Sequence, residues 1–415
     1  PCIIGLGYVG LPVFLQIQKK FLTIGYDKNL HRIKTLNNKI DSNKEYNKKD
    51  LILKNKSFFT NDINKIRNSN FFIVTVPTPI DKKNNPDLKN ILNACLIIGK
   101  ILKEKDLIIF ESTVYPGLTD EICIPKIEKY SKLKINKDFY CGYSPERINP
   151  GDKKRTLSKI IKITSGSNLI ASKIVDNLYK KIIKAGTYNV SSIKVAEASK
   201  VIENTQRDLN VAFVNELAMI FSKMNIDTEE VLNAANTKWN FQKFIPGLVG
   251  GHCIGVDPYY LTYKAKKLGF KPKIISSGRT VNNNMAKFIT KKINEKITIK
   301  KNINSRILIM GITFKENCSD VRNTKVIDLY NQLSKTNNIV DVYDPIVNKI
   351  EVKKIYNLKL TNILKQNYYD AIVISVAHNL FKNIGIKKIR SYGKKKCLIF
   401  DLKYLFDKKN DVIRL

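Results

Sequence analysis

A cysteine framed by glycines, Cys253, is the residue of this chain best suited by type and neighbours to covalent chemistry. It lies in the run VGGHCIGVDP at 249–258. Glycines leave a thiol accessible, and a thiolate can attack an aldehyde once a nearby positive charge or a helix end lowers its pKa. A bland buried cysteine in a glycine turn is the alternative. His252 and Asp257 could suggest a metal, but three ligands within six residues and no partner cluster lead us to expect none.

A glycine-rich motif at the start of the chain has the spacing of a dinucleotide-binding loop. Residues 5–10 read GLGYVG, between a predicted strand and a predicted helix, so Gly5, Gly7 and Gly10 could let the backbone approach a pyrophosphate. Asp27 ends the next predicted strand, 20 residues after Gly7, where an acid can accept a ribose hydroxyl. An acid there repels a 2′-phosphate, so the motif favours NAD over NADP. A purely structural glycine turn is the alternative.

Lys200 and Asn204 are four residues apart in a long helical stretch and therefore share one face. The lysine could offset negative charge, and the amide beside it could donate to an oxyanion. The alternative is an ordinary solvated helix face.

Several polar segments follow predicted strands, near the carboxyl edge where doubly wound sheets bind ligands. They are PTP at 77–79, ESTVYPG at 111–117, YSPERINPG at 143–151, and GITFK at 311–315 with Asp320 and Arg322 beyond it. Each by itself could be a plain loop, but their common placement favours a binding role.

Short β-branched runs alternate with helical stretches through the first third of the chain. Strands are predicted at 2–4, 22–26, 71–76, 107–111, 139–143 and 160–164, with a helix at 88–103 among the connections. This alternation predicts a parallel sheet covered by helices on both faces.

The pattern changes after about Tyr188. No proline or glycine occurs from 191 to 224, and apolar residues recur at helical spacing, which predicts one helix about 50 Å long. It could join two domains and form a dimer surface. A second alternating region has predicted strands at 307–310, 340–343, 371–376 and 397–401 and a helix from Lys325. The two sheets could be distantly related structural repeats.

Composition excludes several classes of protein. The net charge is +37, yet the lysines are spread along the chain, which favours solvated faces over a polyanion-binding site. We expect no membrane span and no signal peptide. Seven scattered cysteines without a CxxC suit the reducing cytoplasm. The chain begins four residues before Gly5 without a methionine, so we expect natural residues to precede it.

Together the motifs identify a resemblance that runs from end to end. The strings VGGHCIGVDPYYLTYKA, YSPERINPGDKKR, SIKVAEASKVIENTQRDLN and FKENCSDVRNTK occur in the order and spacing typical of nucleotide-sugar 6-dehydrogenases, the UDP-glucose and GDP-mannose dehydrogenase superfamily. Within it, the chain is most similar to the UDP-N-acetylhexosamine branch that supplies O-antigen and capsule synthesis.

The resemblance implies an α/β fold with two Rossmann-like doubly wound domains, joined by a long central helix and a helical dimerisation domain. We expect an NAD-binding domain at 1–188, a central domain at 189–303 and a UDP-sugar domain at 304–415. The implied reaction is NAD-dependent four-electron oxidation at C6 of UDP-N-acetyl-D-glucosamine or UDP-N-acetyl-D-galactosamine, through a cysteine thiohemiacetal and thioester. A cytoplasmic homodimer that binds neither nucleic acid nor membrane is also implied.

Residue roles are implied by the same match. Cys253 would be the nucleophile, assisted by Asp257, while Lys200 and Asn204 steady an oxyanion and Thr113 and Glu146 position water and proton transfers. The implied NAD contacts are Gly5, Gly7, Tyr8, Val9, Gly10, Asp27, Arg32, Pro77, Thr78, Ser112, Thr113 and Arg322, the last across the domain boundary. The implied substrate contacts are Glu146, Arg147, Lys200, Asn204, Arg207, Gly250 and Lys315.

One departure bears on the substrate. Relatives that act on UDP-glucose tend to carry a second acid four residues after the position of Glu146, where this chain has Pro150. With Arg147 next to Glu146, this favours an acetamido sugar. UDP-glucose, UDP-N-acetylmannosamine and a catalytically silent sugar-nucleotide-binding protein remain the alternatives.

Overall fold

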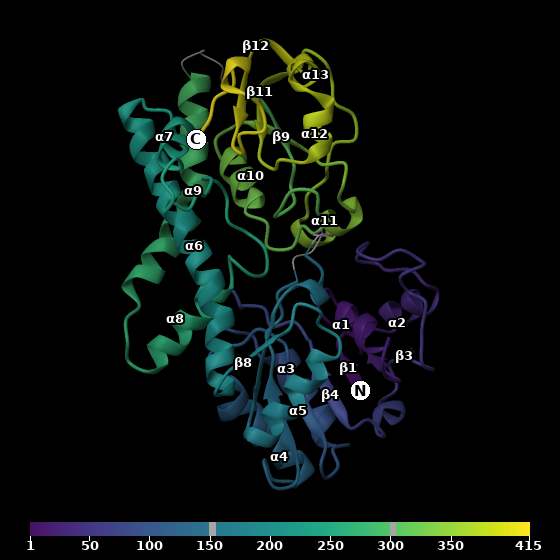
Figure 1. The fold of residues 1–415 in the computed structure, drawn as a ribbon. Helices are drawn as coiled ribbons and strands as arrows, with labels where there is room; N and C mark the ends of the chain where they lie inside the picture. The colour runs from purple at the N-terminus through teal and green to yellow at the C-terminus, as the bar shows by residue number, and fades with distance from the viewer. Residues whose placement is uncertain (149–154, 299–303) are drawn as a thin grey trace. The chain divides into compact units, whose positions relative to one another are not determined.

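The computed structural model describes residues 1–148, 155–298 and 304–415. The chain folds into two compact units. The first unit comprises 1–203 and 259–271, and the second comprises 204–258 and 272–415. Figure 1 shows the elements of both.

The first unit is built on an eight-stranded sheet. Its strands, from one edge to the other, are β3 (Phe58–Thr60), β2 (Ile24–Tyr26), β1 (Cys2–Ile4), β4 (Phe71–Val74), β5 (Leu107–Phe110), β6 (Tyr140–Tyr143), β7 (Lys162–Gly166) and β8 (Thr187–Asn189). The order reverses between β1 and β4, where doubly wound sheets bind ligands. The predicted α/β class and the predicted strands are confirmed.

Two features of this sheet differ from the prediction. β7 pairs antiparallel with β6, so the sheet is not wholly parallel. Strand direction depends on the path of the connection, which strand residues do not encode. Two three-residue strands, β3 and β8, were also not predicted, because their sequences, FFT and TYN, contain no run of apolar β-branched residues.

Helices cover this sheet. The longer ones are α1 (Gly10–Ile17), α2 (Leu30–Asn37), α3 (Lys89–Gly99), α4 (Ile124–Ser131) and α5 (Leu169–Lys180), with single turns η1 (Ile63–Ile66), η2 (Thr119–Cys123) and η3 (Leu157–Lys159). Apolar residues of α1, α2 and α5 form one core cluster with Ile3, Ile73 and Ile109 of the sheet. Side chains alternate between the two faces of a strand, so Phe72 and Ile108 point to the sheet face opposite Ile73 and Ile109.

The predicted long helix is confirmed as α6 (Ile193–Met224), whose 32 residues span about 48 Å at 1.5 Å each. It is followed by α7 (Thr228–Ala235), α8 (Asp257–Lys267) and α9 (Lys273–Thr298). Both α6 and α8 contain a boundary between the two units.

The second unit contains a four-stranded parallel sheet. Its order is β10 (Ile339–Tyr343), β9 (Arg306–Met310), β11 (Tyr369–Ile374) and β12 (Gly393–Asp401). The remaining helices are α10 (Val326–Ser334), α11 (Lys349–Tyr356), α12 (Asn379–Ile384), α13 (Ile386–Ser391) and the turn η4 (Lys408–Asn410). Ile307 and Ile309 pack with α9, α10 and α11, and Leu308 and Met310 pack with α12 and α13, so both faces are covered.

Within the described ranges, no helix is both long and apolar enough to cross a membrane.

Candidate functional site

The glycine loop between β1 and α1 has a different requirement at each glycine. Gly5 adopts a φ of 95°, which favours glycine. At Gly10, an added Cβ would overlap the carbonyl oxygen of Gly5 and the hydroxyl of Thr75. Gly7 is exposed, and an added Cβ would meet no atom within 4 Å. Gly5 and Gly10 therefore serve the fold, whereas Gly7 leaves space above the loop.

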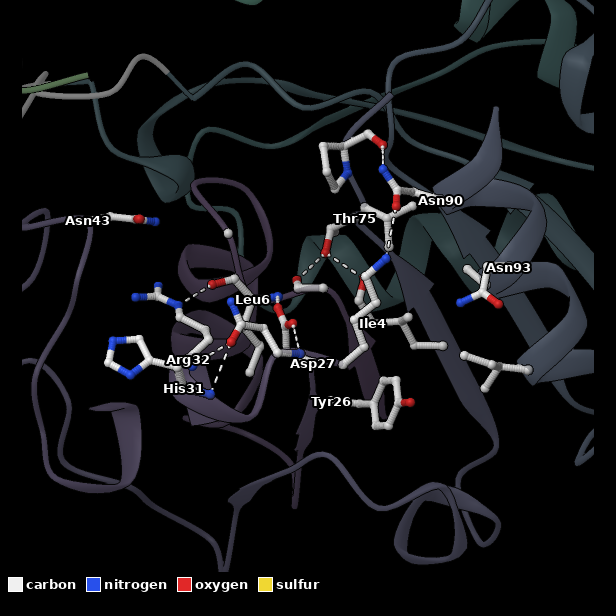
Figure 2. A pocket seen from close by; sticks show the side chains of 18 of the residues that line it. Ile4, Leu6, Tyr26, Asp27, His31, Arg32, Asn43, Thr75, Asn90 and Asn93 are labelled. Carbon is white, nitrogen blue, oxygen red and sulfur yellow. Dashed lines mark hydrogen bonds between the residues drawn. The ribbon is translucent and has the colours of Figure 1, made fainter. Parts of the chain in front are cut away.

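Asp27 and Arg32 hold the backbone of this loop from two sides. The Asp27 carboxylate accepts hydrogen bonds from the backbone N–H groups of Leu6, at 2.8 Å, and Asn29, at 2.9 Å. Arg32 donates through Nε to the Leu6 carbonyl at 2.8 Å and pairs through Nη1 with Asp41 at 2.7 Å. Figure 2 shows both side chains beside Leu6. The carboxylate thus lies where the sequence predicted it, at the end of β2.

A cavity of about 350 Å³ opens above the loop. It is bounded by the ends of β1, β2 and β4, the first turns of α2 and α3, and the loop at 42–43. Five of the predicted cofactor residues line it: Gly5, Gly7, Asp27, Arg32 and Pro77. The other first-unit residues predicted for this role are not among its lining: Tyr8, Val9, Gly10, Thr78, Ser112 and Thr113.

Several lining residues were not predicted from the sequence. Thr75 follows β4, and its hydroxyl donates to the carbonyl of Gly5 at 2.7 Å. Asn90 and Asn93 come from α3, and Asn90 donates to the carbonyl of Pro77 at 3.1 Å. Two amides three apart on a helix that follows a strand were the available signal, but it was too weak to use without the fold.

NAD fits the residues of this cavity. The open space at Gly7 can admit a pyrophosphate, and Asp27 lines the cavity where a ribose hydroxyl can donate to it. Among the described residues, Nη2 of Arg32 is buried without a hydrogen-bond partner, although it belongs to a lining residue. An oxygen of a bound nucleotide would satisfy it.

Hydrogen bonds join the ends of β4, β5 and β6. Ser112 donates to the Val76 carbonyl at 2.7 Å, Thr78 donates to the Thr113 carbonyl at 2.6 Å, and Tyr143 donates to the Ser112 carbonyl at 3.1 Å. Ser112, Thr78 and Thr113 therefore lie together at one edge of the sheet. The half-buried Thr113 is the third residue after β5.

Glu146 and Lys200 form a buried ion pair within the first unit. Nζ of Lys200 lies 2.9 Å from both Oε1 and the carbonyl of Glu146, and Ile148 N–H donates to Oε2 at 2.7 Å. Burial opposes ionisation, but the Lys200 charge and these hydrogen bonds outweigh it and lower the pKa of Glu146. Lys200 is only 2% exposed, so the solvated-face interpretation of it was wrong.

A second buried ion pair, between Lys162 and Glu111, lies in the same unit. Nζ of Lys162, on β7, is 2.7 Å from Glu111 and donates to the carbonyls of Ser144, at 3.3 Å, and Pro145, at 3.1 Å. Tyr179 donates to the same Glu111 carboxylate. Lys162 therefore ties the residue before Ser112 to the residue before Glu146. Sequence gave no signal for it, because its partners are 17 to 51 residues away.

Glu197 secures α6 to the loop after β5. Its carboxylate accepts from the backbone N–H groups of Gly117, at 2.5 Å, and Thr119, at 3.0 Å. Burial raises the pKa of this carboxyl to about 7. Glu197 lies on α6 three residues before Lys200, so it fixes the helix turn from which Lys200 extends.

Cys253 lies on a turn that leads directly into α8. Its carbonyl accepts hydrogen bonds from Val256 at 3.1 Å and Asp257 at 2.8 Å, and Asp257 is the first residue of that helix. Cys253 is half-buried, whereas the six other cysteines are buried. This partial exposure contrasts with the inert buried cysteine that was the alternative.

Asn204 and Asp257 meet in the second unit. Nδ2 of Asn204 donates to Oδ2 of Asp257 at 2.5 Å, and both residues are at most 1% exposed. The solvated-face alternative was therefore wrong for Asn204 as well. Asn204 orients the acid that stands four residues beyond Cys253.

The glycines before Cys253 are needed because another segment packs on them. An added Cβ on Gly250 would come within 2.6 Å of the Asn323 carbonyl, and one on Gly251 would come within 2.6 Å of the Phe314 ring. Gly251 N–H donates to the Asn323 carbonyl at 3.0 Å, and Asn323 donates back to the Gly251 carbonyl at 2.7 Å. The cysteine turn is thus joined to the segment that carries Lys315.

Arg322 forms a two-bond pair with Asp320, at 2.9 and 2.6 Å, and His252 lies 3.6 Å from the same acid. Burial is opposed by these partners, which together hold the pKa of Asp320 below its usual range. The ion pair with Asp320 therefore fixes the position of the Arg322 guanidinium within the second unit. Its predicted contact with NAD stays a prediction.

The remaining predicted substrate residues differ in burial and in bonding partners. Arg147 pairs with Glu203, Arg207 is an exposed residue of α6, and Lys315 is half-buried in the loop after β9. Pro150, on which the choice of sugar partly depends, lies outside the described residues. In the described part of the chain, no group of three or more His, Cys, Asp or Glu residues could hold a metal ion.

Comparison with known families gives three matches in order along the chain. Residues 1–199 match the NAD binding domain of the UDP-glucose/GDP-mannose dehydrogenase family, 194–284 match its central domain, and 308–408 match its UDP binding domain.

Individual relatives are similar over their full length. The chain is 50% identical to UDP-N-acetyl-D-glucosamine 6-dehydrogenases of Pseudomonas aeruginosa and Salmonella typhi, over 100% of this chain and 98% of each relative. It is 46% identical to Protein CapL of Staphylococcus aureus, over 97% of this chain and 95% of that protein. The solved UDP-D-ManNAc dehydrogenase of Pyrococcus horikoshii superposes with a TM-score of 0.88 at 27% identity, over 98% of this chain and 96% of that one.

Proposed function

Because the chain belongs to the UDP-glucose/GDP-mannose dehydrogenase family, whose NAD and UDP binding domains it contains, we propose that it oxidises UDP-N-acetyl-D-glucosamine at C6 to the uronate. The substrate is supported by 50% identity over the whole chain to two proteins named for that activity. Relatives named UDP-N-acetyl-D-mannosamine dehydrogenase are less similar, at 33% identity or below. UDP-N-acetyl-D-galactosamine, which differs at C4 alone, is the second candidate.

The overall reaction balances with two equivalents of cofactor. One primary alcohol, one water and two NAD⁺ give one carboxylate, two NADH and three protons. An alcohol cannot reach an acid by hydride loss alone, because the intermediate aldehyde needs an added nucleophile before it can lose a second hydride.

Cys253 supplies that nucleophile. Its sulfur forms a bond to the aldehyde carbon, and the carbonyl oxygen takes a proton to give a thiohemiacetal. Gly5, Gly7, Asp27, Arg32 and the neighbouring strand ends would hold NAD⁺, which would accept the hydride in both oxidations. Water then attacks the resulting thioester carbon, the C–S bond breaks, and the sulfur leaves as thiolate. The exposure of Cys253 on its glycine turn is the observation that carries this reaction class.

The other residues act on charge and protons. The Lys200 ammonium and the Asn204 amide offset negative charge on the C6 oxygen, and one such donor is typically worth roughly 3 kcal/mol. Glu146, held ionised by Lys200, accepts the proton of the alcohol and later of the attacking water, which Thr113 positions. Asp257, oriented by Asn204, assists Cys253.

The remaining roles complete the proposal. Tyr8, Val9, Gly10, Pro77, Thr78 and Ser112 shape the cofactor site, and Arg322 reaches the bound NAD. The substrate contacts are Arg147, Arg207, Gly250 and Lys315. The division into three domains at 188 and 303 belongs to this proposal, as does a cytoplasmic location and a product used for capsule or O-antigen.

A homodimer is part of the same proposal. Phe213, Ile220 and Met224 of α6 are 56%, 45% and 58% exposed. They are 7 and 4 residues apart and therefore form one apolar stripe on the helix, as expected of a subunit interface.

A substrate panel tests the proposal. The protein is incubated with NAD⁺ and, separately, UDP-N-acetylglucosamine, UDP-N-acetylgalactosamine and UDP-glucose, and kcat/KM is measured from NADH absorbance. We expect the highest value with UDP-N-acetylglucosamine. A higher value with the galactosamine or glucose nucleotide would reassign the substrate. Tight binding of a nucleotide sugar without any NADH would instead support a silent binding protein.

A further inference from the structure

The second sheet repeats the ligand-binding framework of the first in detail. In the first unit, Gly5 has φ 95°, and Leu6 N–H donates to Oδ2 of Asp27 at 2.8 Å. In the second, Gly311 has φ 92°, and Ile312 N–H donates to Oδ2 of Asp344 at 2.7 Å. Both glycines follow the first strand of their sheet and both acids follow the next strand.

The repeat extends to the second carboxylate oxygen and the third strand. Oδ1 of Asp344 accepts from Ile346 N–H at 3.0 Å, as Oδ1 of Asp27 does from Asn29. Ser375, after β11, donates to the Gly311 carbonyl at 2.7 Å, as Thr75 does to Gly5. The same arrangement of strand ends, glycine and acid therefore occurs twice, which supports the suggestion that the two sheets are structural repeats.

The copies differ at the residue three positions beyond the serine or threonine. In the first unit this is Thr78, and a cavity remains beside Asp27. In the second it is His378, which is fully buried against Asp344, with Nε2 3.2 Å from Oδ2. The imidazole thus contacts an acid whose counterpart in the first unit, Asp27, borders a cavity. Asp344 is 1% exposed and is therefore closed to a ribose hydroxyl.

His378 also holds the loop that follows β9. Its Nδ1 accepts from the backbone N–H of Asn317 at 2.9 Å, so a neutral ring carries its proton on Nε2. Nε2 lies 3.3 Å from the hydroxyl of Thr313, and that hydroxyl donates to the carbonyl of Lys315 at 2.7 Å. Asn379 N–H adds a bond to the Asn317 side chain at 2.9 Å. Lys315 is thus fixed on both sides by contacts made from one buried ring and its neighbour.

We propose that His378 is a positioning residue for the nucleoside diphosphate: it covers Asp344, the counterpart of Asp27, and holds segment 313–317 so that Lys315 is presented to the UDP moiety. This rests on the proposed contact of Lys315 with the nucleotide. Without the ring, the loop keeps its sequence but loses the two bonds that fix its ends, so binding has to order it again.

The test measures UDP binding by titration calorimetry, which needs no turnover. His378→Ala should raise the Kd for UDP by about tenfold or more, and raise the KM for the nucleotide sugar similarly, while the KM for NAD⁺ and kcat change less than about twofold. His378→Asn, whose side-chain oxygen can still accept from Asn317, should recover part of the affinity. Tyr369→Phe is the matched control, since it loses a partly buried hydrogen bond to Asp341 elsewhere in the same sheet.

The outcomes separate this inference from the proposed function. Unchanged UDP affinity in both His378 variants, or an equal loss in Tyr369→Phe, would overturn the positioning role even if the wild type oxidises its sugar. If His378→Ala yields no folded protein, the comparison uses His378→Asn and His378→Gln. Weaker UDP binding by the Gln variant than by the Asn variant supports the role, and equal binding by the two overturns it. Failure of the wild type to oxidise any nucleotide sugar would reject the proposed function alone.

Discussion

Two glycines of the nucleotide loop should respond in opposite ways to the same added methyl group. At Gly7 the new Cβ meets nothing within 4 Å and the backbone φ is not positive, so Gly7→Ala fits the fold. Such a change can stabilise a protein by roughly 0.4–1 kcal/mol, because it restricts the unfolded chain. At Gly10 the Cβ overlaps the Gly5 carbonyl and the Thr75 hydroxyl. Backbone atoms of a central strand end cannot move aside cheaply, so Gly10→Ala should cost about 3 kcal/mol or more.

Although Gly7→Ala should not destabilise the fold, it should weaken the binding of NAD⁺. The open space at Gly7 is where the proposed pyrophosphate approaches, so the methyl group of Gly7→Ala should displace it. We expect the Kd for NAD⁺ to rise by about tenfold or more, since even a loss of about 1.4 kcal/mol has that effect. The KM for the nucleotide sugar should change little, because the methyl group lies in the cofactor loop.

The assay combines urea denaturation with NAD⁺ titration calorimetry on both variants. Gly7→Ala should be at least as stable as the wild type and bind the cofactor weakly, and Gly10→Ala should have low stability. The reasoning would be refuted if Gly7→Ala bound NAD⁺ as well as the wild type, or if Gly10→Ala were as stable as the wild type.

Three further predictions concern buried charges and the subunit interface. Lys162→Met leaves Glu111 buried without the ammonium that pairs with it, so the free energy of unfolding in urea should fall by about 3–5 kcal/mol. Adding Glu111→Gln should restore part of this loss. Wild-type stability of the single variant would contradict the prediction. The pKa of Glu197 is raised from 4.5 to about 7, so its folded form binds more protons between these values and stability falls as pH rises through them. Relative to Glu197→Gln, the wild type should lose up to about 3 kcal/mol between pH 5 and pH 8, and a pH-independent difference would argue against it. Phe213→Asp should convert the proposed homodimer to a monomer in light scattering, whereas the equally charged Ile350→Asp, on an exposed face of α11, should not. A dimeric Phe213→Asp would show that α6 does not form the proposed interface.

Motifs with fixed spacing were predictable because their chemistry is local in sequence. The distance from Gly7 to Asp27 is set by one strand–helix–strand unit, so the acid could be placed at the end of β2 before its bonds were known. The long helix α6 was predictable from the absence of proline and glycine. Most strands of both sheets were predictable because each is a short apolar run of its own, whereas β3 and β8 were not.

What could not be predicted depends on contacts between distant segments. The spacing of Lys200 and Asn204 places them on one face, but only their partners, Glu146 and Asp257, bury them. Lys162 and His378 carried no motif at all. The direction of β7 depends on the connection before it rather than on its own residues. In each case the decisive interaction joins residues that sequence spacing does not relate.

If Cys253 enables the second oxidation, the number of NADH molecules formed per sugar depends on its thiol. NADH is measured by absorbance per mole of UDP-N-acetylglucosamine consumed, and the product is identified by mass spectrometry, for the wild type and Cys253→Ala. We expect two NADH per sugar and an acid product from the wild type, and no acid from the variant. One NADH per sugar from the wild type, or acid formed by Cys253→Ala at the wild-type rate, would contradict it.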